Sequence, residues 1–115
     1  MSRQMTRLII PALVALLVSG PAWGETYFDL VQREGLYYKK FTEVPFSGTV
    51  TGRYQGKIKN GKRDGPWVRY HENGQLWSKG TFKDGKKEGP WVYYNEDGTV
   101  NEELTGTFKN GVKVD

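Results

Sequence analysis

The sequence predicts an all-β fold, an elongated antiparallel meander of stacked β-hairpin repeats. The first observation is a phrase that occurs twice: Gly-Pro-Trp-Val stands at residues 65–68 and again at 89–92. The second is the recurring dipeptide Asn-Gly or Asp-Gly, which tolerates the positive φ angles of tight hairpin turns. Between these turns lie short runs rich in aromatic and alternating residues, as in half-buried strands. Gly and Pro recur too often for a long helix.

Alignment of the chain with itself divides it into repeat units. Equivalent glycines and aromatic residues of the two clear copies lie 24 positions apart, and the second copy then carries two extra residues. Terminal units that depart from the pattern are typical of repeat stacks, whose ends must be capped. The predicted units are a degenerate start at 36–55, clear copies at 56–79 and 80–105, and a truncated cap at 106–115.

One stretch ahead of the repeats is ambiguous. Residues 26–34, TYFDLVQRE, fit a short helical turn, and they fit equally the first strand of a hairpin that ends at Gly35. Both interpretations stay open because the stretch is too short for its periodicity to decide.

The first 24 residues have the features of a secretory signal peptide. A basic start is followed by an apolar run at 8–18, too short to span a bilayer. Ala22 and Gly24 then place small residues at −3 and −1 of a cleavage point. Cleavage after Ala22 and a retained anchor are the alternatives. We expect a signal peptide at 1–24, a repeat domain at 25–115, and an exported product, periplasmic in a Gram-negative cell and otherwise secreted.

Charge and composition do not favour a nucleic-acid partner. Lys and Arg number 17 against 13 acidic residues, a net charge of +4. Loss of Arg3 and Arg7 with the leader leaves 15 basic residues against 13 acidic ones, a net +2. There is no long basic run of the kind that binds nucleic acid. The chain has no cysteine, which excludes disulfides and lipid attachment to an N-terminal cysteine.

The residues for catalysis or metal binding do not form a recognisable set. The single histidine, His71, has Asn95 as its repeat equivalent, and a lone histidine beside a turn is most often solvated. Asp64 and Glu88 are equivalent loop acids that more readily bond local backbone amides than perform acid–base chemistry. No metal-ligand spacing and no phosphate-binding loop occurs. We therefore expect no catalytic residue, no metal and no cofactor, and hence no enzyme.

Strand alternation separates the large side chains into two faces. The set expected in the core is Val68, Tyr70, Leu76, Phe82, Val92, Tyr94, Val100, Leu104 and Phe108. The opposite face mixes aromatic and basic side chains, and we expect any binding surface there. This candidate binding face consists of Trp67, Arg69, Trp77, Lys79, Trp91 and Tyr93. The competing interpretation of the recurring Gly-Pro-Trp is architectural, because packing residues must occur in every unit of a stack.

The stretch GKRDGPWVRYHENGQLWSKGTFKDGKKEGPWVYYNEDGTV resembles the variant MORN repeat of bacterial proteins. The resemblance covers residues 56–111 closely, and Phe46-Ser47-Gly48 matches an element common upstream of such repeats. An eight-residue insert before Gly56 is one departure from the pattern. The resemblance implies stacked hairpins in one elongated, twisted sheet and brings no catalytic residue. It also implies a likeness to antitoxins of the YwqK type, and related arrays contact proteins and membrane phospholipids.

Two function hypotheses follow. The first is a non-catalytic, extracytoplasmic repeat module that mediates protein–protein interaction, antitoxin-like or immunity-like, with another protein of the cell envelope as partner. The second is a module that binds a cell-wall polymer, a small ligand or an anionic lipid surface through exposed aromatic and basic side chains. Neither hypothesis involves nucleic acid.

Overall fold

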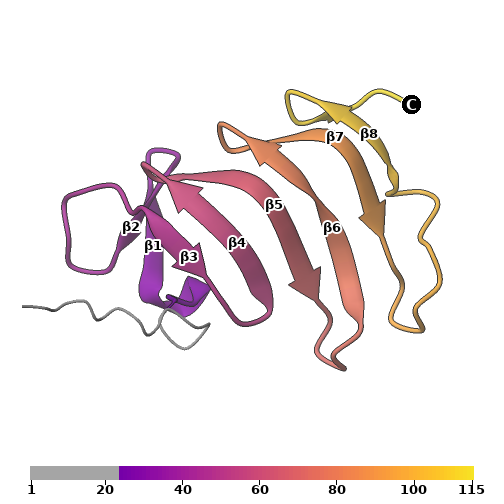
Figure 1. Cartoon of the computed structure of the whole chain (residues 1–115), viewed down its shortest axis with the longest axis horizontal. Coiled ribbons are helices and arrows are strands. Elements are labelled where there is room, and N and C mark those ends of the chain that lie inside the picture. The colour runs from indigo at the N-terminus through magenta and orange to yellow at the C-terminus, as the bar shows by residue number, and fades with distance from the viewer. Residues whose placement is uncertain (1–23) are drawn as a thin grey trace, which may run out of the picture.

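The fold comes from a computed structural model that describes residues 24–115. The predicted signal peptide lies outside the described residues except for Gly24. Seven strands form one antiparallel sheet in which each strand pairs with the next along the chain, and a separate hairpin precedes it (Figure 1). The molecule measures 62 × 32 × 24 Å, so the all-β elongated meander is confirmed.

The elements follow one another in chain order. A 3-10 turn, η3, occupies Tyr27–Asp29, and the first hairpin consists of β1 (Leu30–Arg33) and β2 (Leu36–Lys39). The ambiguous stretch is thus a helical turn and a strand in succession. The large sheet contains β3 (Gly48–Val50), β4 (Tyr54–Lys59), β5 (Lys62–Tyr70), β6 (Leu76–Lys83), β7 (Lys86–Tyr93), β8 (Gly106–Lys109) and β9 (Val112–Lys113).

Tight turns at one end of the hairpins follow from the dipeptides that the sequence repeats. In each of these turns a residue with a φ near 50° precedes a glycine with a φ above 80°. Two successive positive φ angles give a two-residue turn whose twist matches that of the strands. The pairs are Glu34-Gly35, Asn60-Gly61, Asp84-Gly85 and Asn110-Gly111.

Each clear unit is joined to its neighbour by a tryptophan that lies on a glycine. The Trp67 ring on β5 covers Gly56 on β4, and the Trp91 ring on β7 covers Gly80 on β6, so a methyl group at either glycine would overlap an indole. Both tryptophans are buried, at 4% and 3% exposure. The remaining buried apolar residues are Leu30, Val50, Ile58 and Phe82. The core is therefore a thin layer on one side of the sheet.

The tryptophans also satisfy backbone groups where the pairing is irregular. The Trp67 Nε1–H donates to the Lys57 carbonyl oxygen at 2.9 Å, and the Trp91 Nε1–H donates to that of Thr81 at 3.0 Å. Register shifts occur at these places on β4 and β6. Since a bulge interrupts the ladder, an indole N–H that reaches the bulged segment replaces part of the lost bonding.

The expected division into faces is wrong in its main feature. Trp67 and Phe82, which we placed on opposite faces, pack edge to face with ring centroids 6.0 Å apart. Val100 and Leu104, expected in the core, are 42% and 46% exposed. For Trp67 and Phe82 the reason is a register shift: Arg69 pairs with Ser78 but Tyr70 pairs with Leu76, and a one-residue slip moves every side chain to the other face. Val100 and Leu104 are exposed because they lie in the connection between β7 and β8.

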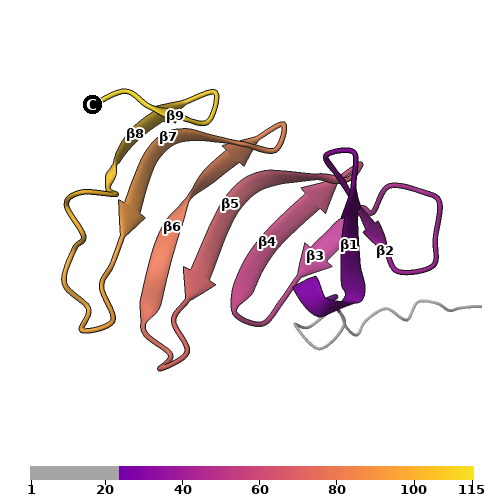
Figure 2. The same ribbon diagram turned by 180° about the vertical axis from the view of Figure 1, so that it is seen from behind.

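The first hairpin covers the N-terminal end of the sheet (Figure 2). Tyr27 of η3 packs on Tyr54 at 4.5 Å and on Trp67 at 6.0 Å between ring centroids, and it stacks on Tyr37 of β2 at 5.5 Å. The Tyr37 N–H donates to the Gly61 carbonyl oxygen at 2.8 Å. This end of the sheet thus has a second layer.

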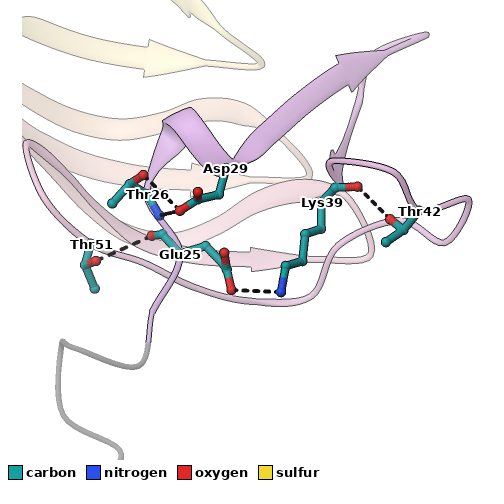
Figure 3. A network of polar contacts seen from close by, with 6 residues as sticks. All are labelled: Glu25, Thr26, Asp29, Lys39, Thr42 and Thr51. Atoms are coloured by element: carbon teal, nitrogen blue, oxygen red, sulfur yellow. Dashed lines mark hydrogen bonds and ion pairs between the residues drawn. The ribbon is translucent and has the colours of Figure 1, made fainter.

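Glu25, the first residue of the expected mature chain, is part of the fold (Figure 3). Its N–H donates to the Thr49 carbonyl oxygen at 3.0 Å, and its carbonyl oxygen accepts the Thr51 N–H at 2.7 Å. These bonds form a short parallel bridge beside Val50 that covers the outer edge of β3. The Glu25 carboxylate also lies 3.3 Å from the Lys39 ammonium.

Asp29 closes η3 by accepting bonds from its start. The Thr26 N–H and the Thr26 hydroxyl both donate to Asp29 Oδ2 at 3.0 Å (Figure 3). These bonds hold the pKa of the Asp29 carboxyl below its usual range. On the other side of the hairpin the Thr42 hydroxyl donates to the Lys39 carbonyl oxygen at 2.7 Å.

Candidate binding cleft on the aromatic face

One face of the large sheet, here called the aromatic face, holds the packed rings and an open cleft of about 300 Å³. The cleft lies over β4 to β7 and is closed at one side by η3. A volume of this size is at the small end of ligand pockets, which run from roughly 300 to 1,000 Å³. Its lining consists of Tyr27, Tyr54, Arg63, Trp67, Val68, Arg69, Ser78, Phe82, Lys87, Trp91 and Tyr93.

The cleft exists because a small residue stands in a row of large ones. Across the strands, Tyr54 pairs with Arg69, Arg69 with Ser78, and Ser78 with Tyr93. Neighbouring strands lie about 4.8 Å apart, so Arg69 and Tyr93 stand about 10 Å from each other across Ser78. Ser78 is 5% exposed and leaves this space unfilled. Tyr54, 24 positions earlier, fills the equivalent space in the preceding unit.

Two arginines in the cleft are held against aromatic rings. The Arg69 guanidinium carbon lies 4.7 Å from the Tyr54 centroid and 3.7 Å from that of Trp77. The Arg63 guanidinium carbon lies 4.1 Å from the Phe82 centroid. Such cation–π contacts stabilise a charge that is partly withdrawn from water, and they fix where the guanidinium groups lie.

A lysine on β7 forms the other side of the cleft. The Lys87 ammonium lies 4.9 Å from the Tyr93 centroid, 5.0 Å from that of Phe108 and 5.2 Å from that of Trp91. It also donates a hydrogen bond to the Tyr93 hydroxyl. Lys87 is the repeat equivalent of Arg63, so each clear unit supplies one cation at this position.

The lining has many donors and few acceptors. It includes three cationic side chains and no aspartate or glutamate. Among the described residues, neither of the two ion pairs involves Arg63, Arg69 or Lys87. The Arg69 Nε–H and the Tyr27 hydroxyl are buried without a hydrogen-bond partner in the described part of the chain. Burial raises the pKa of the Tyr27 hydroxyl, against the opposing effect of the nearby Arg63 guanidinium, so the hydroxyl keeps its proton.

The structure brings together part of the candidate binding face. Arg69 and Tyr93 line the cleft, and Trp77 contacts Arg69 at its rim. Lys79 instead lies on the opposite face, because it directly follows Ser78 in β6 and successive side chains of a strand alternate between the two faces.

Trp67 and Trp91 of the candidate binding face are core residues, so their indoles are covered and cannot stack on a ligand ring. The candidate binding face left out seven of the lining residues, among them Arg63, Lys87 and Tyr54. The signal for the first two was the recurrence of a cation 24 positions apart.

His71 has a packing role. Its ring stacks on the Trp77 ring with centroids 4.6 Å apart, and its Nε2–H donates to the Tyr94 carbonyl oxygen of the next unit at 2.8 Å. The ring is thus half-buried rather than solvated as expected from the sequence. Glu88 Oε1 accepts the Asn110 N–H at 3.1 Å, a backbone amide of the following hairpin rather than the local amide expected.

No group of three or more His, Cys, Asp or Glu side chains in residues 24–115 lies close enough together to hold a metal ion. In the same part of the chain, no helix is long and apolar enough to cross a membrane.

In this fold a tryptophan that lies on a glycine joins each hairpin to the next, and the packed face of the sheet holds a cleft. These features define a β-hairpin repeat module. Residues 63–84 and 87–110 each match the family model of the MORN repeat variant, as the resemblance in the sequence implies. Domains built from MORN repeats are in general non-catalytic modules that contact proteins or membranes. No curated protein and no solved structure gives a match.

Proposed function

We propose that this chain is an exported, non-catalytic module that binds another protein of the cell envelope, in the manner of an antitoxin or an immunity protein. The observation that carries the proposal is the cleft of the aromatic face, a preformed concavity lined by aromatic and cationic side chains. Aromatic residues and arginines are the side chains most enriched at the centres of protein interfaces.

A protein partner fits this surface better than a wall polymer or a lipid bilayer. Sugar rings bind by stacking on open aromatic faces, and both Trp67 and Trp91 are covered. Binding to a flat anionic bilayer uses protruding cations, whereas Arg63, Arg69 and Lys87 are half-buried within the cleft. A protruding side chain of a folded partner can enter such a cleft.

Export is supported by the leader pattern and by Glu25. The residue that would follow cleavage is hydrogen-bonded to Thr49 and Thr51, so the fold needs no residue ahead of it for this bridge. N-terminal sequencing of the protein recovered from the cell envelope should begin at Glu25. A protein that keeps its leader in the cytoplasmic fraction would contradict export.

The partner is tested by site-directed photo-crosslinking of the full chain in its native cells. A benzoylphenylalanine replaces Tyr93 on the aromatic face or, as the matched control, Lys79 on the opposite face. We expect a discrete protein adduct from position 93 and none from position 79. Adducts to lipid or wall polymer alone, or no adduct from either position, would overturn the proposal of a protein partner.

A further inference from the structure

The cleft contains an excess of positive charge that no described residue neutralises. Three cations line about 300 Å³ of open space, and their contacts in the described chain are with aromatic rings and the Tyr93 hydroxyl, not with a carboxylate. Half-buried charges cost free energy unless a partner of opposite sign satisfies them. A ligand of opposite charge would lower this cost, so charge complementarity favours an anion.

The geometry points to a carboxylate site in which a glutamate or aspartate side chain of the partner protein enters the cleft over Ser78, between Arg69 and Lys87. This inference rests on the proposed function and specifies the chemistry of the partner's contact. The gap of about 10 Å between β5 and β7 admits one side chain, flanked by a cation on each side.

The two walls suit a planar anion. The Arg69 guanidinium lies against the Tyr54 and Trp77 rings, which accept no strong hydrogen bond from its N–H groups, and a guanidinium edge matches a carboxylate in a bidentate pair. On the other wall the Tyr93 hydroxyl accepts from Lys87 and keeps its own proton for a second acceptor. Ser78, which is 5% exposed, lies at the floor of the gap between the two walls.

The first experiment measures binding of a defined probe to the purified mature chain. A blocked oligoglutamate peptide is titrated by calorimetry and by tryptophan fluorescence, since the covered indoles of Trp67 and Trp91 lie directly beneath the cleft. We expect saturable binding and none with the matched oligoglutamine peptide. Lys87→Gln should weaken binding roughly tenfold or more, because a charge-assisted hydrogen bond is lost. Lys79→Gln on the opposite face should change it by less than about twofold.

Competition separates a carboxylate site from other anion sites. Inorganic phosphate and vesicles of phosphatidylglycerol in phosphatidylcholine are added to the oligoglutamate complex, and we expect neither to displace the peptide. Displacement by phosphate or vesicles at similar concentrations would overturn the inference. So would equal affinity of Lys87→Gln and Lys79→Gln, with circular dichroism showing that both variants are folded.

The inference and the proposed function can fail separately. If the envelope partner crosslinks equally well to wild type and to Lys87→Gln, the function stands and the carboxylate site is overturned. If oligoglutamate binds as expected while no envelope protein crosslinks, the site stands and the proposed partner does not.

Discussion

Two residues without side chains, Gly56 and Gly80, determine how one hairpin holds the next. Each lies in the middle of a strand, where glycine has no favourable propensity. Each lies under the ring of a tryptophan eleven positions later, Trp67 or Trp91. The glycine is present because the indole needs the space that any Cβ would occupy, and the large ring in turn supplies most of what the thin core can bury.

Gly80→Ala should therefore destabilise the fold. The added methyl group overlaps the Trp91 ring, which the bulge and its hydrogen bond to Thr81 hold in place, and overpacking of this kind costs about 1–3 kcal/mol. Urea unfolding measures the change in the free energy of unfolding. Gly106→Ala is the matched control: it is the equivalent strand position, but its methyl would meet the movable ends of Lys113 and Asp115. Equal losses in the two variants would contradict the role given to the indole.

The same tryptophans act on the strand through their N–H groups. Trp91→Phe keeps an aromatic ring over Gly80 but leaves the Thr81 carbonyl oxygen without its donor. The bond is part-buried, so its loss should cost near the low end of the roughly 1–3 kcal/mol of an orphaned acceptor, measured by chemical unfolding. Trp77→Phe should cost less than about 1 kcal/mol because the ring stays stacked on His71 at the hairpin end. A larger loss of stability in Trp77→Phe than in Trp91→Phe would refute the role of the Trp91 indole in stabilising the bulge.

At the scale of the element, the short turns differ in how well their first residue suits its conformation. Asn60, Asp84 and Asn110 tolerate a φ near 50°, whereas Glu34 adopts the same φ at higher cost. Glu34→Asn should stabilise the protein by up to about 1 kcal/mol, and Asp84→Glu should destabilise it by a similar amount. Thermal unfolding of both variants measures these two changes in stability. A fall in stability for Glu34→Asn would show that its side chain has another role.

The elements were predictable from the sequence where local chemistry determines them. The Asn-Gly and Asp-Gly dipeptides predicted the positions of the turns. The 24-residue period predicted a meander of hairpins that follow one another in chain order. The faces were not predictable, because the shift beside Arg69 depends on which hydrogen bonds the hairpin end can make and leaves no local composition signal. Trp67 and Trp91 are an exception, because their place in the core could have been predicted. A glycine in the middle of a strand, eleven positions before each of them, is typical of a place where another group packs closely on the backbone.

The cleft was less predictable than the fold because it arises from differences between units rather than from what they share. Ser78 in place of Tyr54 opens the space, and Arg69 in place of Tyr93 gives it a cation. The sequence marked the second pair as different but could not place Ser78 between the two walls, since that requires the register of three strands. Export and the identity of the partner remain predictions.

At the scale of the whole molecule, the sheet is covered by a second layer at its N-terminal end and is uncovered at its C-terminal end. The η3 turn and the first hairpin cover β4 and β5, whereas none of the buried residues in the described chain lies beyond Trp91, and Val112 and Val114 are 63% and 58% exposed. In a stack where units contact only their neighbours, local stability follows local burial.

We therefore expect the sheet to open from its C-terminal end. Hydrogen exchange followed by NMR should find the amides of β4 and β5 protected at least roughly tenfold more than those of β8 and β9, because opening the last hairpin exposes little apolar surface. Ile58→Ala should lower protection throughout, since it weakens the covered end on which the later strands depend. Val112→Ala should leave β4 and β5 unchanged. Uniform protection from β3 to β9, lost together in both variants, would instead show that the repeats unfold as one cooperative unit.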